Sequence, residues 1–309
     1  MPLIADISRK LNIKESDFRN DLRDASGKIK HLKIDKKGGG KRKIIVPPWE
    51  FKIVQYSLIL RFLRDIPIHP ASTAFSPGSS IRENASRHLD GFFFVRMDFS
   101  EFFSSISSLD FIEILKQEHG DPYGLSEEFE DPDLVRSVFY KSHCVIGYPA
   151  SPYLANITMT KFDRLVEQKL IEYKSDLGDF NYSRYADDIT ISITNKGKKF
   201  LVENIVRQAV LDSGVRNLKI NPDKTKYGTR RSGNAFVTGM RICKDGRLTL
   251  HRKYKDHVRL LISLYSKGRL GSSDVPKLRG HLNYCFSADP DFYNKLCMKY
   301  FIEVEKIKK

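Results

Sequence analysis

The sequence predicts an α+β fold built from two or three subdomains. Two segments predict strands: residues 91–99 are a run of aromatic and β-branched residues, and residues 182–193 contain a strictly alternating stretch. Three segments between Arg252 and the C-terminus carry apolar residues at helical spacing instead. With 309 residues, 40% of them hydrophobic, the chain can bury a substantial core and exceeds the usual size of one compact domain.

The N-terminal part predicts helices on either side of a β-hairpin. Residues 1–26 mix Leu, Ile and Phe with charges at roughly helical spacing, which favours one or two short surface helices. Residues 29–46 form two alternating segments around Gly38-Gly39-Gly40, which predicts a hairpin with a flexible, basic tip that Pro47-Pro48 ends. Apolar residues recur at helical spacing over residues 51–63, so a helix is expected there.

The middle of the chain predicts a sheet. Residues 91–99 are typical of a strand covered on both faces, which ends at Asp98. Residues 182–193 predict two strands joined at Tyr185-Ala186-Asp187-Asp188. The second strand is expected to be half-buried, with an apolar face of Ile189, Ile191 and Ile193 and a polar face of Asp188, Thr190 and Ser192. Amphipathic helices are expected over residues 254–265, 275–286 and 291–307, separated by Gly/Ser and Asp-Pro breaks.

The charge of the chain indicates a polyanionic partner. The formal net charge is +15, and neutralising phosphates releases counterions whatever the nucleotide sequence. Basic residues crowd the segments 28–43 and 219–231, and acidic residues concentrate between them at 110–133, so the charge is polarised along the chain. Nucleic acid is the favoured partner, and a solvated basic surface is the alternative.

Composition argues against secreted and membrane proteins. There is no stretch of eighteen consecutive apolar residues and no apolar leader at the N-terminus, so we expect a soluble, cytoplasmic protein without a membrane partner. The cysteines have neither the paired spacing of a zinc site nor the density of a disulfide scaffold, and are expected to be reduced and structural. They are Cys144, Cys243, Cys285 and Cys297.

Three aspartates favour metal-dependent chemistry. Asp98 ends a strongly apolar strand, where an unpaired charge would be costly, so something cationic must compensate it. Asp187 and Asp188 lie at the expected turn, and a solvated turn is the alternative interpretation of such a pair alone. Carboxylates on two buried strands suit two Mg²⁺ ions, because Mg²⁺ prefers oxygen ligands and keeps water and phosphate as further partners. Two such ions can activate an attacking hydroxyl and neutralise a leaving pyrophosphate.

These residues resemble those of reverse transcriptases, and within them the bacterial retron enzymes. Tyr185-Ala186-Asp187-Asp188 is similar to the family's Tyr-x-Asp-Asp box, and residues 97–106 resemble the motif with the preceding catalytic Asp. The resemblance runs from Arg42 to the C-terminal helices in the family's order. It implies a right-hand polymerase with fingers, a palm of antiparallel sheet and helices, and a helical thumb, which makes DNA from dNTPs on an RNA template.

The resemblance also implies roles for single residues. Asp98, Asp187 and Asp188 would be catalytic and, with the Phe99 backbone carbonyl, would ligate two Mg²⁺ ions. Asp188 would contribute less directly than Asp187, in keeping with the opposite directions of adjacent side chains in an extended chain. Four residues would bind the incoming nucleotide: Arg42 at its triphosphate, Lys224 at the leaving phosphate, Gly147 beside the templating base and primer, and Phe103 under the sugar.

Weaker interpretations stay open for two of these residues, and one position departs from the family. Arg42 also fits a basic hairpin tip that only aids solubility, and the motif around Lys224 also fits a surface turn. The family usually has Pro-Gln before Gly147, where this sequence has Val145 and Ile146. The usual hydrogen bond from that Gln to the nucleotide is therefore in doubt, which affects fidelity or affinity rather than activity as such.

Two short elements point to retron enzymes. Asn84-Ala85-Ser86-Arg87-His88 matches their Asn-Ala-x-x-His element, and Val237-Thr238-Gly239 matches their Val-Thr-Gly element. For His88 alone, a satisfied structural histidine is the simpler interpretation. The resemblance implies a structured noncoding RNA as template and primer, priming from a 2′-hydroxyl, and a branched RNA-linked cDNA. It further implies a role in anti-phage defence and an effector or toxin protein as partner.

The expected organisation has four parts. They are an N-terminal helical segment (1–27), fingers with the start of the palm (28–97), the palm with inserted fingers elements (98–240) and the thumb (241–309). Basic and aromatic thumb side chains are expected to grip RNA, although ordinary exposed helix faces are the alternative for each. They are Tyr254, Lys255, Arg259, Lys277 and Arg279.

Two other functions stay open. One is a different bacterial reverse transcriptase, defence-associated or similar to group II intron enzymes, which makes DNA without a branch. The other is a noncatalytic RNA-binding protein that has kept the fold, although such a protein has no need of all three carboxylates.

Overall fold

The N-terminal elements follow the predicted order. The computed structural model describes residues 1–35, 39–76 and 78–308, so Lys36, Lys37 and Gly38 of the expected hairpin tip lie outside the described residues. Helices α1 (Leu3–Lys10) and α2 (Glu15–Ala25) pack against α3 (Trp49–Arg61), which begins before the predicted start, directly after Pro47-Pro48. Strands β1 (Lys30–Asp35) and β2 (Lys41–Val46) form the predicted antiparallel hairpin.

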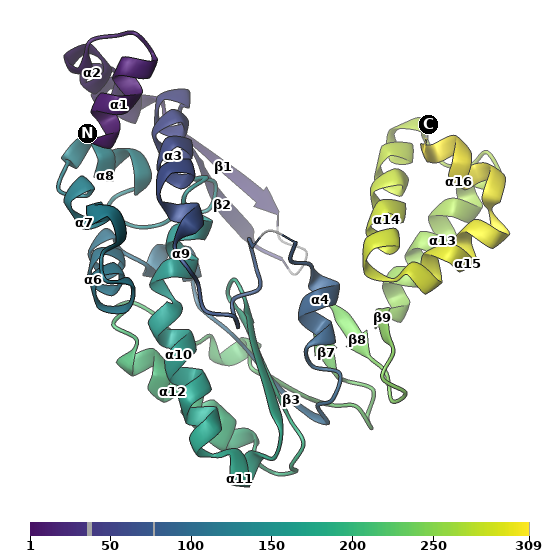
Figure 1. Ribbon diagram of the computed structural model, residues 1–309. Helices are drawn as coiled ribbons and strands as arrows, with labels where there is room; N and C mark the ends of the chain where they lie inside the picture. The colour runs from purple at the N-terminus through teal and green to yellow at the C-terminus, as the bar shows by residue number, and fades with distance from the viewer. Residues whose placement is uncertain (36–38, 77, 309) are drawn as a thin grey trace.

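A four-stranded antiparallel sheet lies at the centre of the molecule (Figure 1). Its strand order is β4-β5-β3-β6, formed by β4 (Phe180–Tyr185), β5 (Asp188–Ile193), β3 (Phe93–Asp98) and β6 (Lys226–Thr229). The register places Asp98 of β3 directly opposite Asp188 of β5. The two strands that carry Asp98 and Asp188 are therefore neighbours, and these acids meet at one end of the sheet.

Helices cover the apolar face of this sheet. Val95, Met97, Ile189 and Ile191 are buried in one hydrophobic cluster with side chains of α10 and α12. The helices between α3 and β6 are α4 (Ile81–Ser86), α5 (Phe102–Ser105), α6 (Ser108–His119), α7 (Leu125–Glu128), α8 (Pro132–Val138), α9 (Ser151–Thr158), α10 (Thr160–Glu172), α11 (Lys174–Leu177) and α12 (Lys199–Asp212). Short 3₁₀ turns span Ser26–Lys28, Leu63–Asp65, Pro122–Gly124, Pro222–Lys224 and Ser272–Asp274.

The other face of β5 is buried as well, so the prediction of a half-buried strand is wrong. Thr190 is 3% exposed and Ser192 is fully buried, and His88 lies against Ser192 on this polar face. The Nδ1 and Nε2 atoms of His88 each lie 2.8 Å from a serine hydroxyl, that of Ser192 on β5 and that of Ser183 on β4. A hydroxyl can donate or accept, so a neutral imidazole is satisfied at both nitrogens. Burial, with a smaller contribution from Arg87, lowers the pKa of His88 to about 3.

A buried ion pair anchors β4 to the helices behind the sheet. The side chains of Arg184 and of Asp163 on α10 are both fully buried, and Nε and Nη2 of the arginine donate to the two carboxylate oxygens at 2.8 and 2.7 Å. The Tyr182 hydroxyl donates to the same carboxylate at 2.5 Å. Arg184 Nη1 also donates to the Ala186 carbonyl at 3.2 Å, within the turn where Ala186 has a left-handed φ of 56°. The guanidinium therefore holds the turn that presents Asp187.

The C-terminal part contains a small sheet that the sequence pattern did not reveal. Strands β7 (Phe236–Val237), β8 (Met240–Ile242) and β9 (Leu248–Leu250) precede α13 (Arg252–Ser266), α14 (Val275–Ala288), α15 (Pro290–Lys299) and α16 (Phe301–Lys308). The prediction of one helix over residues 291–307 is wrong, because Tyr300 has the nonhelical angles φ −131° and ψ 44°. This change of direction lets Val304 and Ile307 pack into the core of the C-terminal helices.

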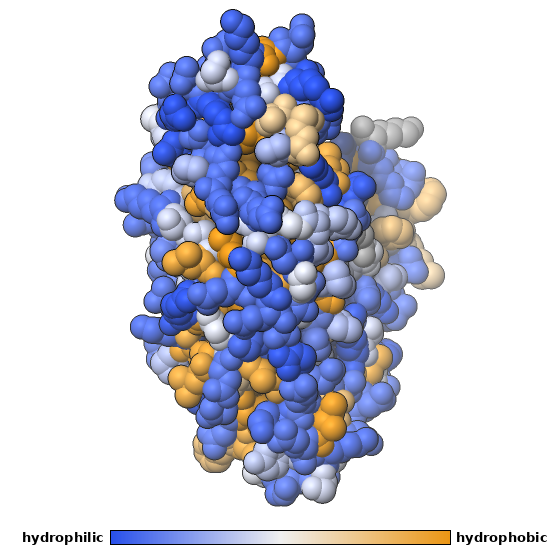
Figure 2. Space-filling model, turned by 60° about the vertical axis from the view of Figure 1, so that its left-hand side comes forward, coloured by the Kyte–Doolittle hydropathy of each residue, from blue (hydrophilic) through white to orange (hydrophobic). Residues whose placement is uncertain are grey.

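The C-terminal helices share that core with two elements of the central body. Ala85 of α4 and Phe94 of β3 belong to the same hydrophobic cluster as β7–β9 and α13–α16. On the surface, the face in Figure 2 is mainly hydrophilic, with hydrophobic patches scattered among hydrophilic residues. The four cysteines are free, and no helix in the described ranges is long and apolar enough to cross a membrane. The subdomain boundaries expected from the sequence remain a proposal.

The buried His88 should make the stability depend on pH. A histidine titrates near pH 6.5 in the unfolded chain, whereas folded His88 stays neutral down to about pH 3. The contribution of neutral His88 to the free energy of unfolding is therefore complete above pH 6.5. It is lost progressively as the pH falls, by about 1.4 kcal/mol at pH 5.5. Urea unfolding of His88→Gln should lack this part of the pH dependence, while exposed His31→Gln should keep it. The same slope in His88→Gln as in the wild type would contradict a neutral buried imidazole.

Loss of Arg184 should destabilise the fold strongly. Arg184→Met leaves the Asp163 carboxylate buried without its partner, which costs about 3–5 kcal/mol. Adding Asp163→Asn in the same chain removes that charge and should restore part of the free energy of unfolding, measured by urea titration. Lys169→Met breaks an exposed pair with Glu172 and should change the midpoint little. A double variant less stable than Arg184→Met would argue against charge burial as the cause.

Candidate active site

The three predicted carboxylates lie at one end of the sheet. Asp98 is 8% exposed at the end of β3, and Asp188 lies opposite it on β5. The Phe99 amide donates to the Asp187 carbonyl at 3.1 Å, and the Asp98 carbonyl accepts from the Asn221 amide at 2.7 Å. Main-chain hydrogen bonds thus tie together the three segments that carry Asp98, the Asp187-Asp188 turn and Lys224.

Crowding of negative charge shifts the titration of these groups. Partial desolvation in the site, followed by repulsion from Asp187 and Asp98, raises the pKa of Asp188 to about 6. Desolvation and repulsion from Asp98 also raise the pKa of Asp187, against the opposing effect of Lys224 and Arg42. Carboxylates that repel one another in this way form a site that attracts cations.

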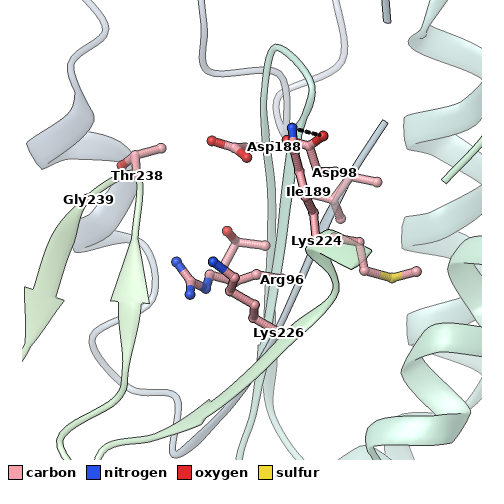
Figure 3. Close-up of a pocket in the computed structure, with 10 residues that line it drawn as sticks. Arg96, Asp98, Asp188, Ile189, Lys224, Lys226, Thr238 and Gly239 are labelled. Carbon is pink, nitrogen blue, oxygen red and sulfur yellow. Dashed lines mark hydrogen bonds and ion pairs between the residues drawn. The ribbon is translucent and has the colours of Figure 1, made fainter. Parts of the chain in front are cut away.

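Lys224 supplies the cation that the sequence predicted beside Asp98. Its Nζ donates to Asp98 Oδ1 at 2.6 Å, the contact drawn as a dashed line in Figure 3. This hydrogen bond raises the pKa of Lys224 despite partial desolvation, so the side chain carries a full positive charge at neutral pH. Lys224 is therefore next to the carboxylates, as the motif implied, and it pairs with one of them.

The donor set fits a divalent cation, although its atoms do not converge on one point. Among the residues that the structure describes, no three His, Cys, Asp or Glu side chains are grouped closely enough to hold a metal ion. Asp98, Asp187 and Asp188 nevertheless offer the hard oxygen ligands that Mg²⁺ prefers. Their mutual repulsion is the unfavourable interaction that a divalent cation would offset.

The hairpin residue Arg42 lies on the same side of the molecule as the carboxylates. Its positive charge is close enough to lower the pKa of Asp187. Gly147 docks the hairpin, because a Cβ atom there would lie 2.2 Å from the Ile45 carbonyl oxygen, and its φ is 111°. The Ile45 amide donates to the Ile146 carbonyl at 2.9 Å. Ile146 therefore contacts the hairpin through its main chain, although its side chain lacks the amide of the family's usual Gln.

The two adjacent phenylalanines have different environments. Phe102 is 4% exposed and stacks on Phe99 with ring centroids 5.5 Å apart, so it is part of the core. Phe103 is only partly buried, and its ring lies 6.3 Å from that of Phe75. Of the two, Phe103 is the one with surface available to a ligand. Its contact with the sugar remains a prediction.

The two retron-type elements meet in one hydrogen-bonded joint. Asn84 accepts from the Thr73 hydroxyl at 2.8 Å and donates to the Thr238 hydroxyl at 3.4 Å. Thr238 in turn donates to the Ile81 carbonyl at 3.1 Å, so α4 and the β7–β8 turn are held together. Ala85 and Val237 are buried beneath this joint, and Thr238 and Gly239 form the turn with left-handed φ values of 46° and 84°.

A cavity of about 130 Å³ separates this joint from the carboxylates (Figure 3). Its walls come from β3, β5, the Pro222–Lys224 turn, β6 and the β7–β8 turn. They are formed by Arg96, Met97, Asp98, Asp188, Ile189, Thr190, Lys224, Lys226, Thr238 and Gly239. The sequence pattern did not single out Arg96 or Lys226 as site residues. For Arg96 there was a signal, because a charged residue two positions before Asp98 in a buried strand is unusual.

The thumb residues expected to bind RNA are not equally available. The Lys255 ammonium donates to the Thr249 hydroxyl at 2.7 Å and its side chain is only 21% exposed, so it is engaged within the C-terminal part. The others lie at the surface or near it with local partners: Tyr254 with His281, Arg259 with Asp256, and Lys277 with Asp274, while Arg279 is exposed. RNA binding by these five side chains remains a prediction.

Comparisons with known proteins show the family of this chain. Residues 34–261 match the family model described as reverse transcriptase (RNA-dependent DNA polymerase). The retron Ec73 reverse transcriptase of Escherichia coli is 36% identical over 280 residues, covering 89% of this chain and 87% of the relative. The retron Ec86 reverse transcriptase of the same species is 27% identical over 308 residues, covering 97% and 89%.

Solved structures show the same fold in more distant proteins. Telomerase from Candida albicans, in complex with a telomeric RNA fragment, has a TM-score of 0.52 at 13% identity. Apo telomerase from Candida tropicalis has a TM-score of 0.53 at 12% identity. Each alignment covers 90% of this chain but only 54% and 58% of the telomerase chains. With its aspartates, its polymerase fold and relatives of this similarity, the chain belongs to the bacterial retron reverse transcriptases and is an RNA-directed DNA polymerase.

Proposed function

We propose that this enzyme uses a structured noncoding RNA as both template and primer. It starts DNA synthesis from a 2′-hydroxyl of that RNA and leaves single-stranded DNA joined to it by a branch. The observation that carries this proposal is the joint between Asn84 and Thr238, because it ties one retron-type element to the other, whose Thr238 and Gly239 line the cavity beside Asp98 and Asp188. The similarity to retron enzymes over most of the chain supports it.

The chain's own groups have distinct tasks in this reaction. Asp98, Asp187, Asp188 and the Phe99 carbonyl would hold two Mg²⁺ ions, which would activate the attacking hydroxyl and offset charge on the leaving pyrophosphate. Lys224 leaves Asp98 for the leaving phosphate, where its ammonium charge stabilises the developing anion. Arg42 grips the triphosphate with its planar guanidinium, and Gly147 keeps the hairpin against the nucleotide site.

The proposal extends to a role in the cell. Anti-phage defence, with an effector or toxin protein as partner in the cytoplasm, rests on the resemblance to retron enzymes alone. A defence-associated or group II intron-like enzyme without branch priming is the alternative, and no contact in the site favours it over the retron type.

The nature of the product tests the proposal. RNA that co-purifies with the protein is sequenced, transcribed and incubated with the enzyme and dNTPs. After RNase treatment, a branched product keeps a short RNA at the 5′ end of the DNA, and a 2′–5′ debranching enzyme removes it and shifts the product on a gel. Linear DNA that the debranching enzyme does not change would support the alternative.

Asp187→Ala should abolish DNA synthesis and leave RNA binding largely intact. The substitution removes a metal ligand, whereas phosphate contacts are made by lysine and arginine side chains elsewhere. Extension of oligo(dT) on poly(rA) and filter binding of the same RNA measure the two properties. Asp179→Ala, which changes an exposed carboxylate, is the matched control and should retain both. Parallel loss of synthesis and binding in Asp187→Ala would count against its role as a metal ligand.

Phe103→Ala should admit ribonucleotides while synthesis continues. In the proposed arrangement the ring lies under the incoming sugar and overlaps a ribose 2′-hydroxyl, so its removal opens space without removing a metal ligand. Primer extension with each nucleotide type measures the ratio of dNTP to rNTP incorporation. Phe102→Ala is the comparison, because Phe102 is packed in the core. A changed ratio in Phe102→Ala alone would shift the assignment by one residue, and no change in either variant would refute it.

A further inference from the structure

We infer that the cavity beside the catalytic aspartates binds the 3′-phosphodiester of the priming nucleotide, through Arg96 and Lys226. The inference rests on the proposed function. A conventional primer ends in a free 3′-hydroxyl and has no phosphate at that position. A nucleotide that primes from its 2′-hydroxyl still carries the RNA chain on its 3′-oxygen, and the active site has to hold this phosphate beside the reacting group.

The sheet register places two cations next to the carboxylates. Arg96 lies two residues before Asp98 on β3, so both side chains point to the same face, about 7 Å apart along the strand. Lys226 of β6 is the direct partner of Arg96 across the strands, and Thr190 is its partner on the other side. A row of Thr190, Arg96 and Lys226 thus runs alongside the pair of Asp98 and Asp188.

These two cations lack the partners that a purely structural role would provide. Within the described residues, neither the Arg96 nor the Lys226 side chain makes a hydrogen bond or an ion pair, although Arg96 is partly buried and feels the attraction of Asp188. Like charges directly opposite each other on antiparallel strands destabilise a sheet. A bound anion between them would remove this repulsion and offset the desolvation of the guanidinium.

The positions of Arg96 and Lys226 beside the carboxylates match the chemistry of a branch. The 2′-oxygen and the 3′-phosphate are attached to adjacent carbons of one ribose, so they cannot be far apart. When the 2′-hydroxyl lies at Asp98 and Asp188, the phosphate therefore falls on the neighbouring part of the same cavity. Arg96 and Lys226 occupy that part, and Figure 3 shows both side chains extending from the sheet on the side of Thr238 and Gly239.

The size and the far wall of the cavity agree with such a ligand. Its volume of about 130 Å³ is much larger than the roughly 10–15 Å³ that one water molecule needs. Thr238 and Gly239 close it opposite the two cations, and Asn84 holds Thr238 in place. The residues that set retron enzymes apart by sequence therefore shape the compartment in which a branching primer differs from a linear one.

Three primers annealed to one RNA template test the inference. The first ends in an ordinary 2′-deoxynucleotide with a 3′-hydroxyl. The second ends in a 3′-deoxynucleotide, which has only a 2′-hydroxyl, and the third ends in a ribonucleotide with a 2′-hydroxyl and a 3′-methylphosphate. We expect the wild type to extend the third primer at least tenfold more efficiently than the second, by kcat/KM, because only the third fills the phosphate subsite.

Substitution of the cations should remove this preference. In Arg96→Met and Lys226→Met, the ratio between the third and second primers should fall below threefold, and Arg96→Lys should retain part of it. The ratio is measured on one preparation, so a general loss of activity cancels. Lys116→Met removes an exposed charge from α6 and should keep the wild-type ratio.

The outcomes separate the subsite from branch priming itself. If the wild type extends the second and third primers equally, or if the Met variants keep the preference, the phosphate subsite is overturned while priming from a 2′-hydroxyl stands. If the wild type extends the first primer and neither of the others, branch priming fails and the subsite fails with it. A preference that Arg96→Met and Lys226→Met abolish and Lys116→Met retains supports the inference.

Discussion

The buried ion pair between Arg184 and Asp163 is the contact on which the geometry of the sheet depends. Two charges without water are tolerated only where hydrogen bonds satisfy them, and here the donors of Arg184 reach Asp163, Asn156 and the Ala186 carbonyl. A slip of β4 by one residue would turn Arg184 to the opposite face. The pair therefore fixes the register of β4, and with it the turn from which Asp187 and Asp188 project.

The opposite face of the sheet is fixed by hydrogen bonds between neutral groups. His88 spans β4 and β5 through Ser183 and Ser192, and Asn84 connects the same helical segment to Thr238. Such bonds are directional, so they specify where α4 lies more sharply than apolar packing would. Asp98, Asp187 and Asp188 thus lie at the end of a sheet whose two faces are held by different kinds of interaction. In the Asn-Ala-x-x-His element, at least the histidine has a structural role.

Local patterns predicted those features of the site that depend on neighbours in sequence. The alternation after Asp188 predicted to which face of the sheet each β5 side chain points. The apolar run before Asp98 predicted that β3 ends at this residue. What escaped prediction depends on partners far along the chain: Arg184 with Asp163, Arg96 opposite Lys226, and His88 against β4 and β5. The short strands β7–β9 escaped as well, because two or three residues are too few to show an alternating period.

Phe94 connects the strand of Asp98 to the C-terminal part of the chain. It lies on the same strand as Asp98, and its side chain belongs to the hydrophobic cluster that also contains residues of α4, of β7–β9 and of the C-terminal helices. Close-packed side chains transmit displacement, because a gap at such a contact forfeits its attraction. The C-terminal helices therefore share a continuous core with the strand that carries Asp98. A displacement of those helices would disturb the packing around that strand.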